Sequence, residues 1–221
     1  MRMIYASGAI ALFMAACGPM AEGTTAHKLT QMAVAKVGRS SSPETSPAPA
    51  TAPAMTRANI DNSPVPLMLM TAQDLGGAAV VQLASKNKER ETYISPDGIA
   101  VTMVGGIATA TRGFSEDLFA SNPVHTLKAI HSGGGISEKL IEYLDSNDRI
   151  KSVILKCEIS KVENIKLKIV ETVYDTVRFR EHCVNEEYDH INYYWADKTG
   201  NIVQSQQWIS FSVGYLVTQL L

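Results

Sequence analysis

From residue 66 to the end, the chain consists of short apolar or alternating runs separated by turn residues. Runs of this kind, bounded by glycine, proline and aspartate, are typical of β-strands. The Asp97-Gly98 pair between two of the runs is a specific signal for a β-hairpin. In the first part of this region the runs are residues 66–74, 77–86, 90–95, 99–104 and 107–112.

Two later runs show which face of their strand is apolar, because successive residues of a strand point to opposite faces. In residues 151–160 one face carries Val153, Leu155, Cys157 and Ile159. In residues 173–183 the apolar face carries Val173, Val177, Phe179 and Cys183, interrupted by Asp175 and Glu181. Both cysteines fall on apolar faces, which indicates a place inside a core built by a sheet.

The end of the chain predicts a further hairpin, residues 188–209, and a last strand, residues 213–221. The turn of this hairpin is the segment Asp197-Lys198-Thr199-Gly200. Residues 113–135 separate the two groups of strands and allow helical turns but no long helix. The pattern therefore predicts one mainly β domain, residues 65–221, with few short helices.

The first residues have a different character and indicate export. Arg2 precedes an apolar run that ends at Phe13, and two alanines then lead to Cys17. This is typical of a signal peptide, residues 1–16, and the run is shorter than the roughly 20 apolar residues of a transmembrane helix. Cys17 resembles the acylated cysteine of a bacterial lipobox and is the predicted lipidation site; the alternative is an incidental cysteine in a plain secretory signal. Gly18 in place of aspartate favours sorting to the outer membrane.

Between the signal and the β domain, residues 17–64 are predicted to act as a lipid-anchored segment and linker. Six of the nine prolines lie between Pro43 and Pro66, among alanine, serine and threonine. Such a composition buries little apolar surface and favours extended conformations. Ahead of it, residues 25–37 have apolar residues at helical spacing and could form a short helix.

Charge and cysteine content narrow the partners and the compartment. The formal net charge is −2 and charged residues make up 19% of the chain, so nucleic acid is not an expected partner. With Cys17 acylated, Cys157 and Cys183 remain, and an even remainder in an exported chain favours one disulfide. Two buried thiols are the alternative.

Two segments carry a family resemblance. The first, residues 111–121, contains Arg112-Gly113 and Asp117. The second, residues 193–219, contains Trp195, Asp197, Gly200, Gln204-Ser205, Gln207-Trp208 and Gly214-Tyr215. With these motifs the chain, over residues 66–221, resembles the YjbF/GfcB family of lipoproteins associated with group 4 capsule and exopolysaccharide export. The lipobox and the spacing of the cysteine pair fit the α-proteobacterial form of that family.

The resemblance implies a large curved antiparallel sheet, similar to the half-barrel of Lol-type lipoprotein carriers. It also implies an outer-membrane lipoprotein on the periplasmic face, with other polysaccharide-export proteins as partners. The activity of the family is poorly defined, so the resemblance implies no catalytic residue.

The residues themselves support no active site, cofactor or metal site. The five histidines form neither HExxH nor a zinc-type spacing with cysteine, and the glycine runs lack the P-loop and dinucleotide motifs. Arg112 is expected to pair with Asp117 and to fix the loop that follows it; the alternative is a contact with an anion or a sugar acid. Trp195 and Trp208, in an aromatic-rich C-terminal region, belong either to a β core or to a platform for a sugar or a protein.

Three functions remain. The first is a non-enzymatic accessory component of capsule or exopolysaccharide secretion. The second is a carrier or binding module that holds acyl chains or a glycan in the half-barrel. The third is a polysaccharide-modifying enzyme, which would need two carboxylates about 5–9.5 Å apart in a cleft.

Overall fold

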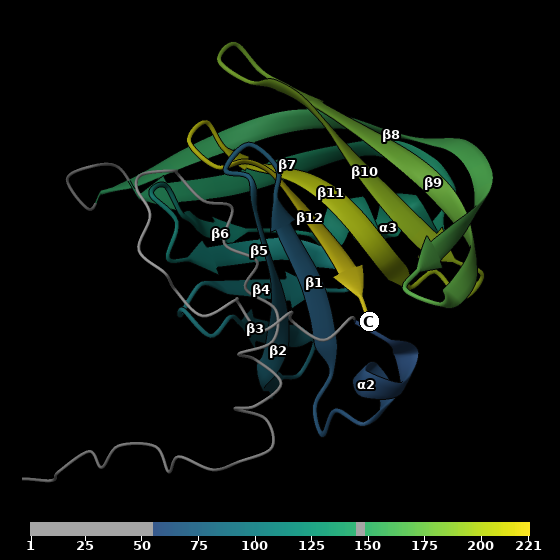
Figure 1. The fold of residues 1–221 in the computed structure, drawn as a ribbon. Coiled ribbons are helices and arrows are strands. Elements are labelled where there is room, and N and C mark those ends of the chain that lie inside the picture. The colour runs from purple at the N-terminus through teal and green to yellow at the C-terminus, as the bar shows by residue number, and fades with distance from the viewer. Residues whose placement is uncertain (1–54, 145–148) are drawn as a thin grey trace, which may run out of the picture.

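The computed structural model describes residues 55–144 and 149–221, which form one twelve-stranded antiparallel sheet and two short helices (Figure 1). The sheet order is β5-β4-β3-β2-β1-β12-β11-β10-β9-β8-β7-β6. The strands are β1 (Leu67–Ala72), β2 (Gly77–Asn87), β3 (Arg90–Ile94), β4 (Ala100–Val104), β5 (Ile107–Arg112), β6 (Leu118–Ser121), β7 (Gly134–Leu144), β8 (Ile150–Ile169), β9 (Thr172–Val184), β10 (Asp189–Asp197), β11 (Ile202–Ser210) and β12 (Gly214–Leu220).

The sheet curves until its two end strands meet, so it is nearly closed into a barrel. The first and last strands, β1 and β12, pair in the middle of the sheet. The end strands β5 and β6 follow one another in the chain, and the N–H of Leu118 donates to the hydroxyl of Thr111 at 2.9 Å. The predicted mainly β fold and its large curved antiparallel sheet are therefore confirmed.

Helix α3 (Val124–His131) lies against the inner face of the sheet (Figure 1). Thr126, Ala129 and Ile130 are its buried residues. The inner face of β8 is the predicted one, with every second residue from Val153 to Ile159 buried. Helix and sheet together form the main apolar core, so α3 and core side chains occupy the interior that the strands surround.

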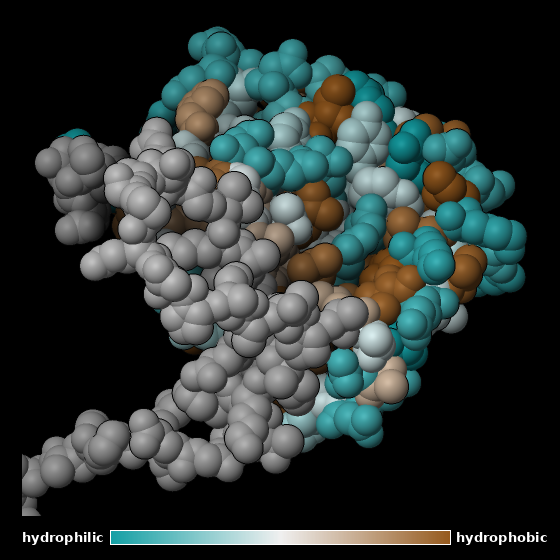
Figure 2. Space-filling view, viewed as in Figure 1, coloured by the Kyte–Doolittle hydropathy of each residue, from teal (hydrophilic) through white to brown (hydrophobic). Residues whose placement is uncertain are grey.

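The β8–β9 hairpin is the longest that the structure describes, and it bends beyond the barrel. A register shift between Lys161 and Glu163 marks the bend. Its far end brings Ile169 onto the outer face of the sheet, where a second apolar cluster forms with Trp195 and Val203. Figure 2 shows apolar atoms gathered between this end of the hairpin and the end of β12.

This bend corrects one detail of the predicted apolar face. Val173, expected in the core, is 56% exposed because it lies in the part of β9 that extends past the barrel. The two predicted turns are confirmed: Asp97-Gly98 joins β3 to β4, and residues 197–200 join β10 to β11.

Helix α2 (Arg57–Asp61) precedes the first strand and packs onto the domain. The Thr56 side chain caps it, Ile60 is buried, and the N–H of Arg57 donates to Glu171 at the tip of the β8–β9 hairpin, at 3.2 Å. The predicted signal peptide, the lipidation site Cys17 and most of the proline-rich segment lie outside the described residues. Among the described residues, no helix has both the length and the apolar character to cross a membrane.

Candidate functional site

A buried ion pair lies inside the barrel. Strand alternation places Glu181, between Phe179 and Cys183, on the inner face of β9, where it is 0% exposed. The Nζ of Lys139 on β7 lies 3.0 Å from its carboxylate, and Lys139 is also buried. Two charges of opposite sign thus share an interior that is otherwise largely apolar.

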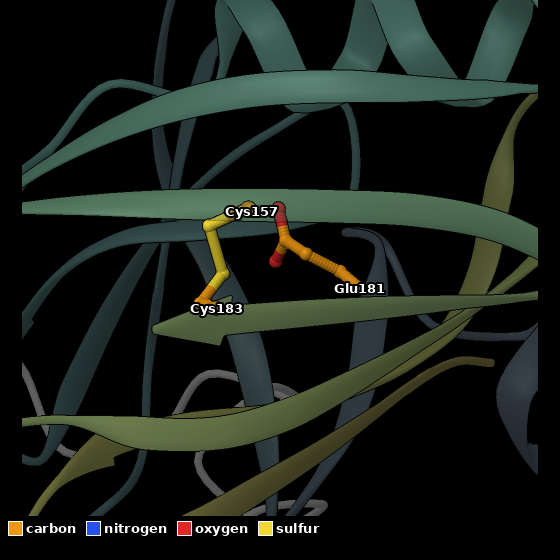
Figure 3. A group of neighbouring side chains, drawn as sticks. All are labelled: Cys157, Glu181 and Cys183. Atoms are coloured by element: carbon orange, nitrogen blue, oxygen red, sulfur yellow. A yellow bond between two sulfur atoms is a disulfide. The ribbon is translucent and has the colours of Figure 1, made fainter. Parts of the chain in front are cut away.

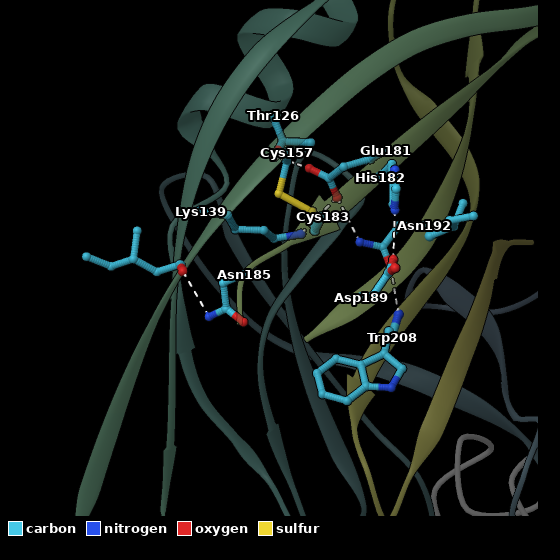
Figure 4. The surroundings of a disulfide bond; sticks show 12 residues. Thr126, Lys139, Cys157, Glu181, His182, Cys183, Asn185, Asp189, Asn192 and Trp208 are labelled. Carbon is cyan, nitrogen blue, oxygen red and sulfur yellow. Dashed lines mark hydrogen bonds and ion pairs between the residues drawn. A yellow bond between two sulfur atoms is a disulfide. The ribbon is translucent and has the colours of Figure 1, made fainter. Parts of the chain in front are cut away.

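Three uncharged side chains complete the surroundings of Glu181, and Figure 4 shows Thr126 and Asn192 among them. The hydroxyl of Thr126 on α3 donates at 2.6 Å, the amide of Asn192 at 2.8 Å and the hydroxyl of Tyr194 at 2.7 Å. Burial alone would raise the pKa of Glu181, but Lys139 and these three hydrogen bonds hold the pKa below its ordinary value. Glu181 is therefore a fully satisfied carboxylate that joins helix and sheet.

The disulfide lies beside this carboxylate (Figure 3). Cys157 and Cys183 stand directly opposite one another in the β8–β9 pairing and are bonded, as the sequence predicted. Their sulfur atoms and the Glu181 carboxylate lie within 4.8 Å of one another, a grouping that could suggest a metal site. Since the sulfurs are bonded to each other and the carboxylate accepts from four donors, these groups stabilise the fold.

At one end of the barrel, five rings form what we call the ring cluster: Tyr143, Tyr188, His190, Trp208 and Phe211. The indole of Trp208 lies at its centre and stacks on His190, with the ring centroids 4.7 Å apart. Edge-to-face contacts join Trp208 to the other three rings. Phe211 also stacks on Tyr188 at 5.2 Å and is 67% exposed, so one end of the ring cluster faces solvent.

Two members of the ring cluster are buried without hydrogen-bond partners. Within the described part of the chain, no partner reaches the hydroxyl of Tyr143 or either ring nitrogen of His190. Both side chains are more than nine-tenths buried. Burial raises the pKa of Tyr143, and it lowers the pKa of His190 to about 4, so His190 is neutral at pH 7. Buried polar groups without partners cost stability and call for an explanation.

Asn192 connects the buried ion pair to the ring cluster. Its amide nitrogen donates to Glu181, and its side-chain oxygen accepts from the backbone N–H of Trp208 at 2.8 Å (Figure 4). The backbone of Trp208 is therefore fixed by the same network that holds the ion pair.

The two segments that carry the family motifs meet beside the ring cluster. Glu116, in the β5–β6 loop, accepts from the backbone N–H and the hydroxyl of Ser212, in the β11–β12 turn, at 3.2 and 3.0 Å. Its backbone carbonyl accepts from Ser210 at 3.0 Å. These bonds hold the turn that carries Phe211 against the loop.

The predicted pair of Arg112 and Asp117 is wrong. Asp117 accepts from the Thr111 hydroxyl at 2.7 Å and from the backbone N–H groups of Gly113 and Phe114 at 2.9 and 3.3 Å. Arg112 is exposed, donates to the Thr111 carbonyl at 3.0 Å and lies over Phe119, 5.4 Å from the ring centre. Alternation along β5 directs Arg112 away from Asp117. Asp117 does fix the loop, but through backbone donors.

The two tryptophans lie in different places. Trp195, with Tyr193, belongs to the outer apolar cluster beneath the β8–β9 hairpin, while the neighbouring Tyr194 points inward to Glu181. Both faces of β10 are thus covered. Trp208 packs at the edge of the main core and stays partly exposed, which leaves it as the tryptophan nearer to a surface.

The buried ion pair was not predicted from the sequence, although the sequence contains a signal for it. Glu181 interrupts an apolar face, and Lys139 stands likewise among alternating residues of β7 whose other members are buried. Charges at inward positions of two strands predict a buried pair, but only the strand order shows that they meet.

Comparison with known proteins gives one family and a solved structure. The family model of the group 4 capsule polysaccharide lipoprotein GfcB, YjbF, matches residues 26–221. The crystal structure of the hypothetical lipoprotein YmcC from Escherichia coli K12 is similar, with a TM-score of 0.64 and 19% sequence identity; the match covers 74% of this chain and 87% of that one. The curated proteins give no match. At this identity the structural likeness supports the fold alone.

Proposed function

Because this chain belongs to the YjbF family of group 4 capsule polysaccharide lipoproteins, we propose that it is a non-catalytic accessory component of capsule or exopolysaccharide secretion. The observation that best supports this role is that the charged groups inside the barrel have structural partners. The charged groups inside the barrel bind one another and α3, and so they hold the domain together rather than standing ready for a reaction.

In this proposal Cys17 anchors the protein at the periplasmic face of the outer membrane. The lipobox-like sequence and Gly18 support the anchor and its sorting. The residues between Cys17 and α2 give the β domain reach from the membrane, whereas α2 itself packs onto the domain. The domain then contacts other proteins of the export system, while the lipid anchor keeps it in place.

An acyl-chain carrier is less well supported. A carrier needs an enclosed apolar cavity, whereas here α3 and core side chains fill the inner face. A pocket of about 690 Å³ lies between the β2–β3 turn and the segment that joins β6 to α3. It mixes apolar residues such as Leu140 and Val124 with the charged side chains of Lys88, Glu89 and Glu142. Such a lining does not suit a hydrocarbon chain.

An enzyme is also less well supported. A glycoside hydrolase needs two carboxyl groups free to exchange protons across a cleft. Near the ring cluster, however, Glu116 holds the β11–β12 turn, Asp117 holds its own loop, and Asp189 contacts His182 at 2.7 Å. These carboxylates are engaged in keeping the local backbone and side chains in place.

Deletion and complementation of the gene test the proposal. Secreted polysaccharide should fall in the deletion strain, return with the wild-type gene, and return incompletely with Cys17→Ser, which cannot be acylated. Polysaccharide from the deletion strain should keep its chain length when it is incubated with the purified protein. Normal secretion after deletion would contradict the accessory role, and shortening of the polymer by the purified protein would favour the enzyme.

A further inference from the structure

The exposed end of the ring cluster combines two features that are unfavourable in a free protein. Phe211 presents a large apolar ring to solvent from a turn that Glu116 keeps in place. Directly behind it, Trp208 contacts both Tyr143 and His190, whose polar atoms have no hydrogen-bond partner among the described residues. A ligand that offered an apolar face and hydroxyl groups would relieve both.

We propose that the ring cluster binds a sugar ring of a polysaccharide chain. A pyranose carries C–H bonds on its faces, which pack on aromatic rings, and hydroxyl groups around its edge, which can donate and accept hydrogen bonds. The ring cluster offers the complementary pair, aromatic rings with a few polar groups among them, as small-ligand sites usually do. This inference rests on the proposed role in polysaccharide secretion and names the surface that meets the polymer.

The bound sugar ring packs against Phe211 and Trp208, and one of its hydroxyl groups bonds to the Tyr143 hydroxyl. Phe211 is largely exposed and its ring contacts Tyr188 and Trp208, so in this proposal a turn of its side chain admits the sugar to the groups beside Trp208. The backbone of the turn stays fixed by Glu116 and Ser210.

The charges around the ring cluster favour a neutral sugar. Lys151 lies over the Tyr188 ring but is paired with Glu187 at 2.9 Å. His182 is likewise paired with Asp189. Since each of these two basic side chains already has an acidic partner, an anionic sugar would gain little from either of them.

The two tryptophans allow a direct test with the full chain purified in detergent. The chain contains only Trp195 and Trp208, so its NMR spectrum has two indole N–H signals. Cellohexaose, maltohexaose and xylohexaose, each at millimolar concentration, serve as neutral probes. We expect at least one of them to shift the Trp208 signal in a saturable way. The Trp195 signal, beneath the β8–β9 hairpin, should not move.

Removal of the Tyr143 hydroxyl separates binding from stability. Tyr143→Phe should leave the thermal stability unchanged or higher, since that hydroxyl has no partner among the residues that the structure describes. It should nevertheless weaken sugar binding about tenfold, the effect of one lost hydrogen bond. Phe211→Ala should weaken binding to a similar extent. Tyr93→Phe is the matched control. The Tyr93 hydroxyl donates to Glu91 at 3.3 Å and does not belong to the ring cluster, so this variant should bind sugar as the wild type does.

Three results would overturn the inference: no shift with any of the three oligosaccharides, equal shifts of both tryptophan signals, or wild-type affinity in Tyr143→Phe. A ring cluster that serves as a contact for another protein would give the first of these. Loss of sugar binding would not affect the proposed accessory role, which depends on secretion by the deletion strain. Conversely, normal secretion after deletion would remove that role even if sugar bound.

Discussion

The ammonium of Lys139 on β7 reaches the carboxylate of Glu181 on β9, although β8 lies between these two strands. Neighbouring strands are about 4.8 Å apart, so the lysine and glutamate side chains together span roughly twice that distance across the inner face. The pair therefore links three strands, and the Thr126 hydroxyl extends the link to α3.

Loss of one partner of this pair should destabilise the domain strongly. Lys139→Met leaves a buried carboxylate without its cation and should lower the free energy of unfolding by about 3–5 kcal/mol. Adding Glu181→Gln removes the charge and keeps one acceptor oxygen, which can serve the Asn192 and Tyr194 donors that now share Oε2, so it should restore part of the loss. Urea unfolding of both variants measures this, and a double variant that is less stable than Lys139→Met would contradict it.

Asp117 should matter for stability, whereas Arg112 should not. Asp117→Ala removes the acceptor of three hydrogen bonds in the β5–β6 loop and should cost about 1–3 kcal/mol. Arg112→Ala changes an exposed side chain and should stay within about 0.5 kcal/mol of the wild type. Thermal unfolding compares the two. If Arg112→Ala were folded and abundant but failed to support secretion, Arg112 would be a contact for a partner or ligand.

The disulfide should stabilise the domain by restricting the unfolded chain. It closes a loop with a sequence separation of 26, for which chain entropy gives about 3.5 kcal/mol. Replacing both Cys157 and Cys183 by alanine should lower the stability by about this amount, as measured by urea unfolding. Mass spectrometry without reductant should recover the two cysteine peptides joined; two free thiols in protein purified from the envelope would contradict the pairing.

Mild acid should weaken the fold through His190. Its pKa is lowered to about 4 in the folded protein, while the unfolded chain has the ordinary value of about 6.5. The unfolded chain therefore binds more protons between these values, so stability is complete above pH 6.5 and falls towards pH 4, by up to about 3 kcal/mol. His190→Phe should flatten this part of the pH dependence, and His125→Gln, on an exposed part of α3, should not. An unchanged slope in His190→Phe would show that other groups cause it.

The lipid anchor can be checked directly. Metabolic labelling with a palmitate analogue should tag the wild-type protein, because Cys17 follows two alanines at the end of a signal-like run. The Cys17→Ser variant should carry no label. A labelled Cys17→Ser protein would place the acyl group elsewhere.

Local sequence predicted much of the fold because strands and turns depend on near neighbours. The alternation that buries Leu155 and Cys157 and the glycines at positions 98 and 200 are visible without any knowledge of strand order. The disulfide followed from the number of cysteines in an exported chain. The bend that exposes Val173 could not be predicted in this way, because it depends on a register shift between β8 and β9.

The candidate site was harder to predict because its members are distant in the chain. Lys139 and Glu181 are 42 residues apart, and Glu116 reaches Ser212 across 96 residues. The wrong pairing of Arg112 with Asp117 shows the opposite error: two charges close in the sequence were expected to meet, but nearby backbone N–H groups are the better donors for a carboxylate in a tight loop.

The position of β1 has a mechanical consequence. Whatever lies before residue 55 joins the domain through α2 and then β1, which pairs with β2 on one side and β12 on the other. A pull on that connection loads a strand in the middle of the sheet along its length. The hydrogen bonds on both of its sides must then yield together, whereas an end strand such as β6 could be peeled away one bond at a time. The domain is thus attached by one of its strongest strands.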